Sequence, residues 1–167
     1  MARIAVYPGT FDPVTLGHLD IIKKSLLIFD KLYIGVVDDN SLGKNVLFTS
    51  KERKEMIDND VRDFHSVEVH IFSGLLVDFM ESVNANFIIR GVRTITDLEY
   101  EFNMNYINKM FNNKIETIFL PAELQYQMVS STAIKKIAHI DQDIEKISQF
   151  TSRDIAEILI HKIQSKF

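Results

Sequence analysis

Short apolar runs alternate with longer amphipathic segments along most of the chain. The runs are rich in β-branched and aromatic residues and therefore predict strands, at residues 3–7, 32–37, 67–72, 87–90 and 117–120. Between and after them, apolar residues recur every three or four positions, which predicts helices at residues 17–29, 50–60, 75–83, 95–111, 130–138 and 152–165. Strands and helices are thus expected to follow one another in turn.

This alternation is typical of an α/β protein, here a Rossmann-like, doubly wound sheet of five parallel strands with helices on both faces and right-handed crossovers. No Ser/Gly linker, low-complexity tract or internal repeat divides the sequence, so residues 1–167 are expected to form a single domain. Ligand sites in such sheets lie beyond the carboxyl ends of the strands. The loops that follow the strands are therefore candidate sites of chemistry, at residues 8–17, 38–49, 73–75, 91–94 and 121–129.

The first of these loops carries the densest cluster of special residues. Residues 7–18 read YPGTFDPVTLGH and hold two of the three prolines and two of the six glycines. They lead from a strand into a helix whose first turn carries His18, and the free N–H groups of a helix N-terminus favour a phosphate. At that position protonation of the His18 imidazole is disfavoured, and the neutral ring can donate an N–H hydrogen bond to a phosphoryl oxygen. The alternative is a plain connection with Asp12 or Thr15 as N-cap and His18 exposed, which so many special residues make the weaker interpretation.

Two later loops contain cationic side chains. Lys44 lies in the second loop, where it could swing onto a phosphate, although a solvated surface lysine is the better interpretation of that loop alone. Arg90 and Arg93 follow the fourth strand and can clamp anionic oxygens with paired hydrogen bonds. The equally favoured alternative is an ion pair with a nearby carboxylate, that of Asp97, Glu99 or Glu101.

Three hydroxyls precede the helix predicted at residues 130–138, those of Ser130, Ser131 and Thr132. One hydroxyl is enough to cap the helix, so three in a row are more than capping requires. They would also suit a phosphate bound to the backbone N–H groups at the start of this helix. With the cationic residues they would lie on one edge of the sheet, which indicates a polyphosphate site. Neither GxGxxG nor GxxxxGK[ST] occurs, and no metal-ligand cluster follows the strands. A Mg²⁺ ion held mainly by the phosphates of the substrate would need few protein ligands, which is compatible with the absence of such a cluster.

Composition narrows the classes of function. Hydrophobic residues make up 46% and charged residues 25% of the chain, which is typical of a globular protein. The net charge is −4, so nucleic acid is not an expected partner. The lack of cysteine excludes disulfides and thiolate metal sites. No leader is evident and no run approaches the roughly 20 apolar residues of a membrane span, so a cytoplasmic location away from membranes is expected.

Other segments are expected to be structural. Apolar and aromatic residues crowd positions 102–111, which indicates core packing or, where they exceed one helix face, a subunit contact. The polar residues 141–145 are interpreted as a solvated connection, and the helix predicted at residues 152–165 as a packing helix.

The motifs of the strand-end loops resemble those of a known family. Residues 10–18, TFDPVTLGH, match the TFDPxTxGH signature of the nucleotidylyltransferase superfamily. The later segments Ile89–Arg93 (IRGVR), Asp97–Glu101 (DLEYE) and Val129–Thr132 (VSST) look like the remaining motifs of the bacterial phosphopantetheine adenylyltransferase family. The first motif alone indicates only the superfamily. The combination of all four motifs is far more specific for this family, because they occur in the same order and together cover nearly the whole chain.

The resemblance implies transfer of the adenylyl group of ATP to 4′-phosphopantetheine by direct in-line attack, giving dephospho-coenzyme A and pyrophosphate, with Mg²⁺ held mainly by the ATP phosphates. It also implies a homohexamer and feedback inhibition by coenzyme A. The catalytic residues would be His18, as transition-state stabiliser, with Lys44 and Arg93. Phosphopantetheine would be bound by Thr10, Lys44, Leu76 and Arg90. ATP would be bound by Thr10, Phe11, His18, Gly91, Val92, Arg93, Glu101, Tyr126, Gln127, Met128, Val129, Ser130, Ser131 and Thr132.

The residues support this chemistry independently. A phosphate nucleophile is already ionised near neutral pH, so it needs no general base, and the loops contain no Ser–His or Cys–His couple for covalent catalysis. Two alternatives stay open: another nucleotidylyltransferase, acting on nicotinate mononucleotide or glycerol 3-phosphate, and a nucleotide-binding module without catalysis. The chain departs from the family in having one lysine and no proline before Phe48, and a tyrosine at position 126 where tryptophan is common.

Overall fold

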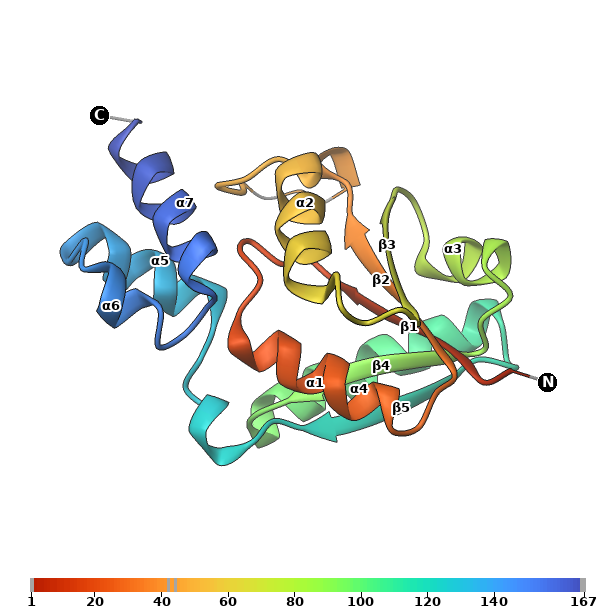
Figure 1. Cartoon of the computed structure of the whole chain (residues 1–167). Coiled ribbons are helices and arrows are strands. Elements are labelled where there is room, and N and C mark those ends of the chain that lie inside the picture. The colour runs from red at the N-terminus through yellow and green to blue at the C-terminus, as the bar shows by residue number, and fades with distance from the viewer. Residues whose placement is uncertain (1, 42, 44, 166–167) are drawn as a thin grey trace.

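The computed structural model describes residues 2–41, 43 and 45–165, which form a parallel five-stranded sheet with helices on both faces (Figure 1). The strand order is β3-β2-β1-β4-β5, so the doubly wound fold is confirmed. Each predicted strand is present with ends shifted by two residues or fewer. The strands are β1 (Ile4–Gly9), β2 (Lys31–Val37), β3 (Val67–Phe72), β4 (Phe87–Val92) and β5 (Glu116–Pro121).

β1 and β4 are paired over only part of their length, which leaves a crevice between them. β1 pairs with β2 along its whole length, from Ile4 to Gly9. With β4 it pairs at two positions only, Ala5 with Phe87 and Val6 with Ile88. The two strands therefore separate toward their carboxyl ends. This is the point where the strand order reverses, and ligand sites of such sheets form there.

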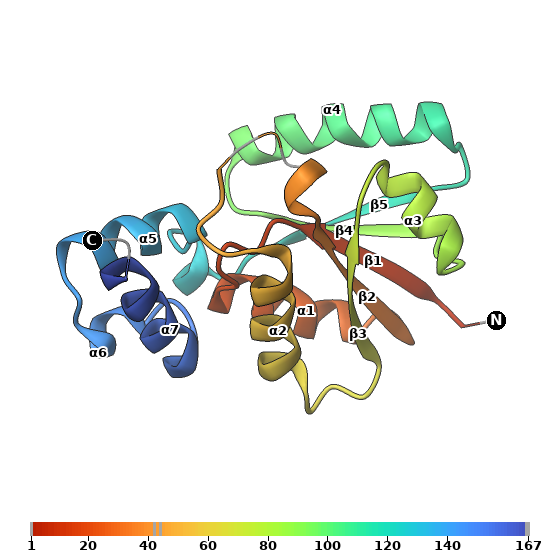
Figure 2. The ribbon, with the colours of Figure 1, turned by 90° about the horizontal axis from the view of Figure 1, so that it is seen from above.

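The helices form two layers and a separate group (Figure 2). α1 and α2 cover one face of the sheet, α3 and α4 cover the other, and α5, α6 and α7 gather beyond the carboxyl ends of the strands. No helix within the described part of the chain has both the length and the apolar character that a membrane span requires. The helices are α1 (Leu16–Leu26), α2 (Ser50–Val61), α3 (Leu76–Ser82), α4 (Ile95–Phe111), α5 (Ser131–Ile140), α6 (Ile144–Ile147) and α7 (Arg153–Gln164), with 3₁₀ turns η1 (Asp39–Ser41) and η2 (Leu124–Tyr126).

The short helix α6 was not predicted: residues 141–143 form the expected connection without being buried, whereas residues 144 and 145 belong to the helix. Asp143 caps it, because its carboxylate accepts hydrogen bonds from the backbone N–H groups of Glu145 and Lys146. Ile147 at the end of α6 is fully buried in the apolar cluster that includes α7. One buried isoleucine per turn is too weak a pattern to stand out among polar neighbours.

Apolar side chains form two clusters, one on each face of the sheet. The larger cluster lies under α1 and α2 and continues into the α5–α7 group, where the packing role predicted for the last helix is confirmed by buried Ile155, Leu159 and Ile163. The smaller cluster lies under α3. α4 contains no buried residue. Its crowded apolar residues are thus half-buried at most, and the large ones that are exposed are Ile95, Tyr100, Phe102, Tyr106, Ile107, Met110 and Phe111.

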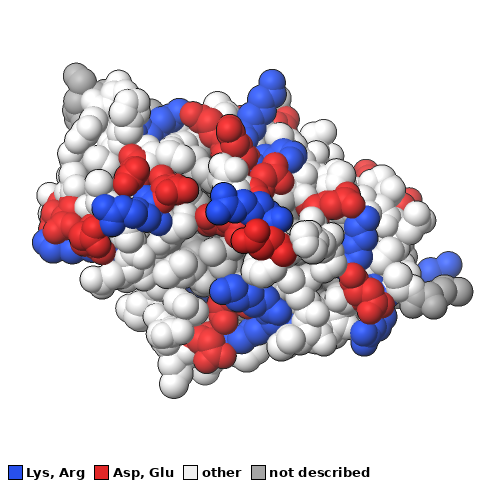
Figure 3. Space-filling view, in the orientation of Figure 1, with Lys and Arg blue, Asp and Glu red and all other residues white. Residues whose placement is uncertain are grey.

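Charged side chains are interspersed on the face of the molecule drawn in Figure 3, where acidic and basic groups lie next to one another. Ion pairs join charged side chains on or between neighbouring elements of the molecule, such as Lys54 with Asp58 on α2 and Lys162 of α7 with Glu52 of α2. This face carries no broad patch of one sign.

A buried arginine joins the carboxyl ends of β1 and β2. The side chain of Arg53 on α2 is fully buried. It donates hydrogen bonds to the carbonyl oxygens of Phe48 (3.1 Å), Thr10 (2.5 Å) and Val37 (2.9 Å) and to the carboxylate of Asp39 (2.6 Å). Burying a charge is costly unless it is paired and hydrogen-bonded, and Arg53 meets both conditions. The first two strand-end loops are thereby fixed relative to each other.

We expect Arg53→Met to lower the free energy of unfolding by about 3–5 kcal/mol, because it leaves three buried or partly buried carbonyl groups and Asp39 without their donor. Urea unfolding followed by circular dichroism would measure this. The matched control is Arg153→Met, since Arg153 is exposed on α7 and its ion pairs with Glu145 and Glu157 lie in water. Equal stability losses in the two variants would contradict the anchoring role of Arg53.

Candidate functional site

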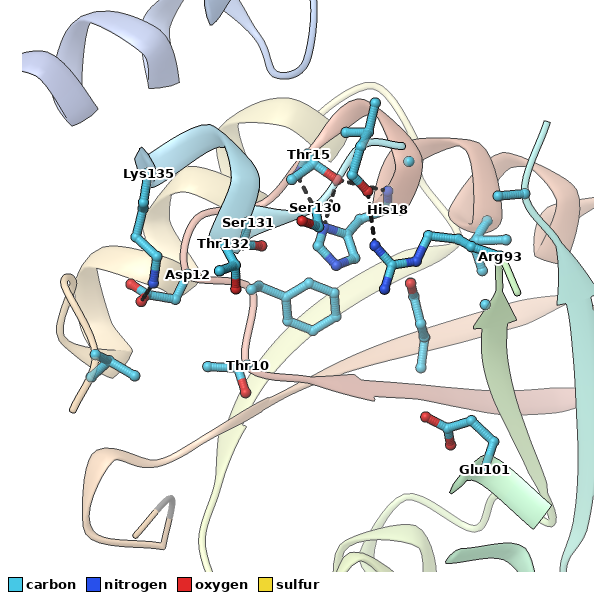
Figure 4. A pocket seen from close by; sticks show the side chains of 18 of the residues that line it. Thr10, Asp12, Thr15, His18, Arg93, Glu101, Ser130, Ser131, Thr132 and Lys135 are labelled. Atoms are coloured by element: carbon cyan, nitrogen blue, oxygen red, sulfur yellow. Dashed lines mark hydrogen bonds and ion pairs between the residues drawn. The ribbon is translucent and has the colours of Figure 1, made fainter. Parts of the chain in front are cut away.

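A cavity of about 560 Å³ opens at the carboxyl ends of the strands, between the β1–α1 loop, the end of β4 and the start of α5 (Figure 4). It brings together most of the residues predicted to form the site, from four separate segments. The predicted residues that line it are Thr10, Phe11, His18, Gly91, Arg93, Glu101, Val129, Ser130, Ser131 and Thr132. Ten candidate residues from distant parts of the sequence thus share one concave site.

The β1–α1 loop folds tightly around the ring of Phe11. Phe11 has φ of 53°, a left-handed conformation that a bulky residue seldom adopts and that is found mainly at functional sites. Its ring meets the rings of Tyr7 and His18 edge-on, with centroids 5.4 and 4.9 Å away. Gly9 is required here, because a Cβ at that position would lie 2.9 Å from the Phe11 ring. The loop therefore holds the His18 ring against a buried aromatic wall.

The start of α1 determines which nitrogen of His18 carries its hydrogen. Thr15 is the N-cap, and its hydroxyl accepts from the backbone N–H of His18 at 3.3 Å. In return the backbone N–H of Thr15 donates to Nδ1 of His18 at 3.0 Å, which completes a capping box. Since Nδ1 accepts this bond, the neutral ring carries its hydrogen on Nε2. Nε2 has no hydrogen-bond partner among the described residues, so its N–H is available to a ligand.

His18 is held in its neutral form. Burial of the ring, assisted by the positive charge of Arg93, lowers the pKa of His18 from 6.5 to about 4. A positively charged ring would also face the positive end of the α1 dipole. These surroundings agree with the neutral imidazole expected from the sequence. The alternative in which His18 is merely exposed does not fit, because the ring is partly buried and lines the cavity.

Arg90 at the end of β4 and Arg93 just after it are both paired with carboxylates. Arg93 donates from Nε to Asp97 at 3.1 Å and from Nη1 to the carbonyl of Val129 at 3.2 Å. Arg90 pairs with Glu101 and donates from Nη1 to the carbonyl of Pro8 at 3.0 Å. The ion-pair alternative is therefore realised for both. Each guanidinium has five N–H donors, so each keeps donors for a ligand while its position is fixed.

Arg90 lies beside a second, smaller cavity. This cavity has a volume of about 180 Å³ and is lined by Arg90 together with Pro8 and Gly9 of β1. Tyr7, Phe11, His18, Gly91 and Glu101 line both cavities. The two cavities are thus neighbours on either side of these shared residues.

The three hydroxyls before α5 have separate roles. Ser130 is the N-cap, and its Oγ accepts from the backbone N–H of Ala133 at 3.1 Å. Ser131 donates from Oγ to the carbonyl of Pro13 at 2.7 Å, which ties α5 to the β1–α1 loop. Thr132 is exposed and lines the cavity. One hydroxyl caps the helix, one joins two segments and one faces the site.

Sequence reasoning missed a buried ion pair at the edge of the site. Asp12 is 3% exposed and accepts hydrogen bonds from the backbone N–H groups of Leu47 and Phe48 and from Nζ of Lys135 on α5. Figure 4 shows the Lys135–Asp12 pair beside Ser131 and Thr132. The sequence contained one usable signal: Lys135 follows Ser131 by four residues and so lies on the same face of α5. Other lining residues that were missed are Tyr7, Thr15, Gly17, Ile21, Asn45, Val46 and Ala122.

Several predicted site residues lie outside the main cavity. Leu76 packs in the apolar cluster under α3, and Arg90 lies at the smaller cavity. Val92 belongs to β4, and residues 126–128 form the end of η2 and the turn before α5 without lining either cavity. Lys44 is outside the described residues. Within the described part of the chain, no group of three or more His, Asp or Glu side chains could hold a metal ion.

The chain is similar to proteins of known families. Residues 6–137 match the model of the cytidylyltransferase-like family. The chain is 42% identical over 164 residues to a phosphopantetheine adenylyltransferase of Lachnoclostridium phytofermentans, covering 98% of each protein. It is 49% identical over 136 residues to a phosphopantetheine adenylyltransferase of Clostridium tetani, covering 81% of this chain and 84% of the relative.

Solved structures share the fold at lower identity. A crystal structure from Vibrio parahaemolyticus, provisionally named a nicotinate-nucleotide adenylyltransferase, superposes with a TM-score of 0.71 at 20% identity over 96% of this chain and 99% of that one. The nicotinic acid mononucleotide adenylyltransferase of Plasmodium falciparum gives a TM-score of 0.63 at 14% identity over 99% of this chain and 96% of that one. At these identities the likeness concerns the fold alone.

We expect the imidazole of His18 to stay neutral down to about pH 4, because burial and Arg93 both disfavour its charged form. Proton NMR of the ring hydrogens across pH 3–8, assigned with His18→Gln, would measure this. The unfolded chain takes up a proton at His18 near pH 6.5 and the folded chain does not. The contribution of His18 to folding stability is therefore complete above pH 6.5 and is lost as pH falls from 6.5 toward 4. A His18 midpoint near 6.5 in the folded protein would contradict the enclosed ring.

Proposed function

The chain belongs to the cytidylyltransferase-like family and, within it, to the phosphopantetheine adenylyltransferases, and we propose on that premise that it transfers the adenylyl group of ATP to 4′-phosphopantetheine. The products are dephospho-coenzyme A and pyrophosphate. An oxygen of the phosphate of phosphopantetheine attacks the α-phosphorus of ATP. The bond from the α-phosphorus to the bridging oxygen breaks, and pyrophosphate leaves with the electron pair.

The observation that carries the catalytic proposal is the free Nε2–H of a neutral His18 in the main cavity. Charge develops on the oxygens around the α-phosphorus during in-line attack, and a fixed N–H donor stabilises it without reorganisation. Arg93 lines the same cavity and supplies positive charge. The remaining work is alignment of the two substrates, which a rigid loop and paired arginines provide.

The substrate assignments of the individual residues follow the family resemblance and the two cavities. ATP is assigned to the main cavity, where the N-terminus of α5 and its exposed Thr132 suit phosphate oxygens. Phosphopantetheine is assigned to Thr10, Arg90 and Leu76, with its phosphate directed to the junction of the cavities. Lys44, outside the described residues, remains assigned to the same phosphate through the resemblance. Residues 126–128 remain assigned to the nucleotide on the same basis.

Mg²⁺ is proposed to arrive with ATP. Asp12 lines the main cavity beside Ser131 and Thr132, and its carboxylate oxygens already accept from two backbone N–H groups and from Lys135. The residues present therefore fit an ion held mainly by phosphate oxygens and water. Such an ion would neutralise phosphate charge while His18 and Arg93 act on the reacting group.

The acceptor is tested by offering Mg²⁺–ATP with each candidate in turn and measuring release of pyrophosphate. We expect release with 4′-phosphopantetheine and none with nicotinate mononucleotide or glycerol 3-phosphate. Release with one of the latter would assign the chain to another branch of the nucleotidylyltransferases. ATP binding without release in any mixture would instead indicate a nucleotide-binding module.

We expect His18→Ala to lower kcat about 10²–10³-fold while ATP binding measured by calorimetry changes little, because the lost donor acts mainly on the transition state. His18→Gln is the matched variant, since glutamine at the third helical position can keep the capping box through its Oε1, while its amide N–H lacks the fixed position of the imidazole Nε2–H. Both variants should lose turnover, and only His18→Ala should lose helix capping. Unchanged kcat in His18→Ala would remove His18 from the mechanism.

We also propose that the chain forms a homohexamer and that coenzyme A, which shares the pantetheine arm, inhibits it by feedback. The support from this chain is α4, a 17-residue helix with no buried residue and several large exposed apolar side chains. Exposed apolar surface of this extent is typical of a contact between subunits.

We expect light scattering of the purified chain to give the mass of six chains and Met110→Glu on α4 to lower that mass. Met110 is 73% exposed in the single chain, so the substitution should leave its fold intact. Ile140→Glu is the matched control, since Ile140 is equally apolar and exposed but lies at the end of α5. A mass unaffected by Met110→Glu, or one equal to a single chain for the unaltered protein, would contradict the role of α4.

A further inference from the structure

The hydroxyl of Tyr7 is a polar group that the proposed mechanism leaves without a role. Tyr7 lies on β1, is 6% exposed, and its ring packs within the larger apolar cluster. Its hydroxyl has no hydrogen-bond partner among the described residues. The hydroxyl oxygen is not among the enclosed polar atoms that lack a partner, so it is accessible from the cavities that Tyr7 lines, and phenylalanine would fill this place in the cluster equally well. Packing therefore explains the ring but not the hydroxyl.

Tyr7 lines both cavities at the point where they meet. Gly91 lies beside its hydroxyl: a Cβ on Gly91 would come to 3.5 Å from the hydroxyl oxygen and 2.9 Å from Ile21. The absence of a side chain at position 91 thus leaves the space in front of the hydroxyl open. Arg93 borders one cavity and Arg90 the other, and each is paired with a carboxylate, of which Glu101 lines both cavities. An anion placed between the cavities would therefore meet the remaining N–H donors of both guanidinium groups.

We propose that Tyr7 is a further catalytic residue, whose hydroxyl donates a hydrogen bond to a phosphate oxygen at the junction of the two cavities. The inference rests on the proposed function, in which the phosphate of the acceptor and the α-phosphate of ATP meet at that junction. The hydroxyl keeps its proton throughout, and the bonds made and broken are those of the adenylyl transfer itself. It acts beside His18, whose ring centroid lies 6.4 Å from that of Tyr7.

The surroundings of Tyr7 fit a donor and not a base. Burial raises the pKa of its hydroxyl above the ordinary range, and this effect outweighs the opposing influence of Arg90 and Arg93. The hydroxyl therefore stays protonated at any pH at which the protein works. An already ionised phosphate nucleophile needs no base, but the charge on its oxygens and on the α-phosphate needs donors. A neutral donor also adds no charge to a site that Arg90 and Arg93 already make positive.

Tyr7→Phe tests the proposal, because it removes one oxygen and keeps the ring in the apolar cluster. Tyr33→Phe is the matched control, since Tyr33 lies on the neighbouring strand β2, outside both cavities, with Lys31 over its ring. We expect Tyr7→Phe to lower kcat/KM for adenylyl transfer about 10–100-fold and Tyr33→Phe to leave it unchanged. Urea unfolding should show that Tyr7→Phe is no less stable than the unaltered protein, which separates the loss from misfolding.

Two binding measurements distinguish the phosphate that receives the bond. If it is the acceptor phosphate, Tyr7→Phe weakens binding of phosphopantetheine but not of pantetheine, which lacks the phosphate. If it is the α-phosphate in the transition state, binding of ATP and of phosphopantetheine is unchanged and kcat alone falls. Values of kcat and of both binding constants within twofold of the unaltered protein would overturn the proposal.

The unaltered protein is assayed first, so that failure of the proposed function is recognised separately. If it releases pyrophosphate with phosphopantetheine, an unaffected Tyr7→Phe overturns the role of Tyr7 alone. If it does not, the proposed function fails. The hydroxyl's contact with phosphate is then decided by calorimetry with ATP and with phosphopantetheine, where equal affinities in Tyr7→Phe and the unaltered protein overturn it.

Discussion

The buried guanidinium of Arg53 is the interaction on which the arrangement of the strand-end loops depends. It lies where the end of β2, η1, the loop after β1 and the loop before α2 meet, and each of these supplies one of its acceptors. The Thr10 carbonyl that it holds belongs to the loop that then turns through Phe11 to His18. A buried guanidinium that is shielded from water is stable only when all of its hydrogen-bond acceptors are in place. The loops that supply these acceptors are therefore restricted to very few conformations. The position of the His18 ring in the cavity is thus determined from outside the cavity.

The electrostatics of the site combine fixed cations with neutral donors. Arg90 and Arg93 are held by carboxylates of α4 and by backbone carbonyls, while His18 is held by the backbone of its own helix turn. A ligand with several phosphates therefore meets donors whose directions are set before it arrives, which is the condition for strong electrostatic stabilisation. The carboxylates on Arg90 and Arg93 also limit the net positive charge of the empty site. This explains how an acidic protein can hold a phosphate site without a broad basic surface.

Local patterns were the part of this protein that could be predicted from its sequence. The strands and most helices were found because each has its own periodicity, and the β1–α1 loop because its prolines, glycines and His18 lie within twelve residues. The capping box at α1 was half visible, in that Thr15 was one of two candidate caps. Contacts between distant segments were not predictable: Arg53 with Thr10 spans 43 residues and Lys135 with Asp12 spans 123. Nor could periodicity show that α4 leaves most of its large apolar side chains exposed in the described structure.

The last helices of the chain close on its first loop. Thr151 donates from Oγ1 to the carbonyl of Val14 at 2.8 Å, the backbone N–H of Leu16 donates to the carbonyl of Phe150 at 2.9 Å, and Ser131 holds Pro13. During synthesis on the ribosome, the segment that bears His18 emerges early, whereas the residues that fix it emerge more than a hundred positions later. A nascent chain can thus form most of its sheet before it can bind nucleotide. The chain can act on ATP only when the α5–α7 group has been synthesised and has packed against the β1–α1 loop.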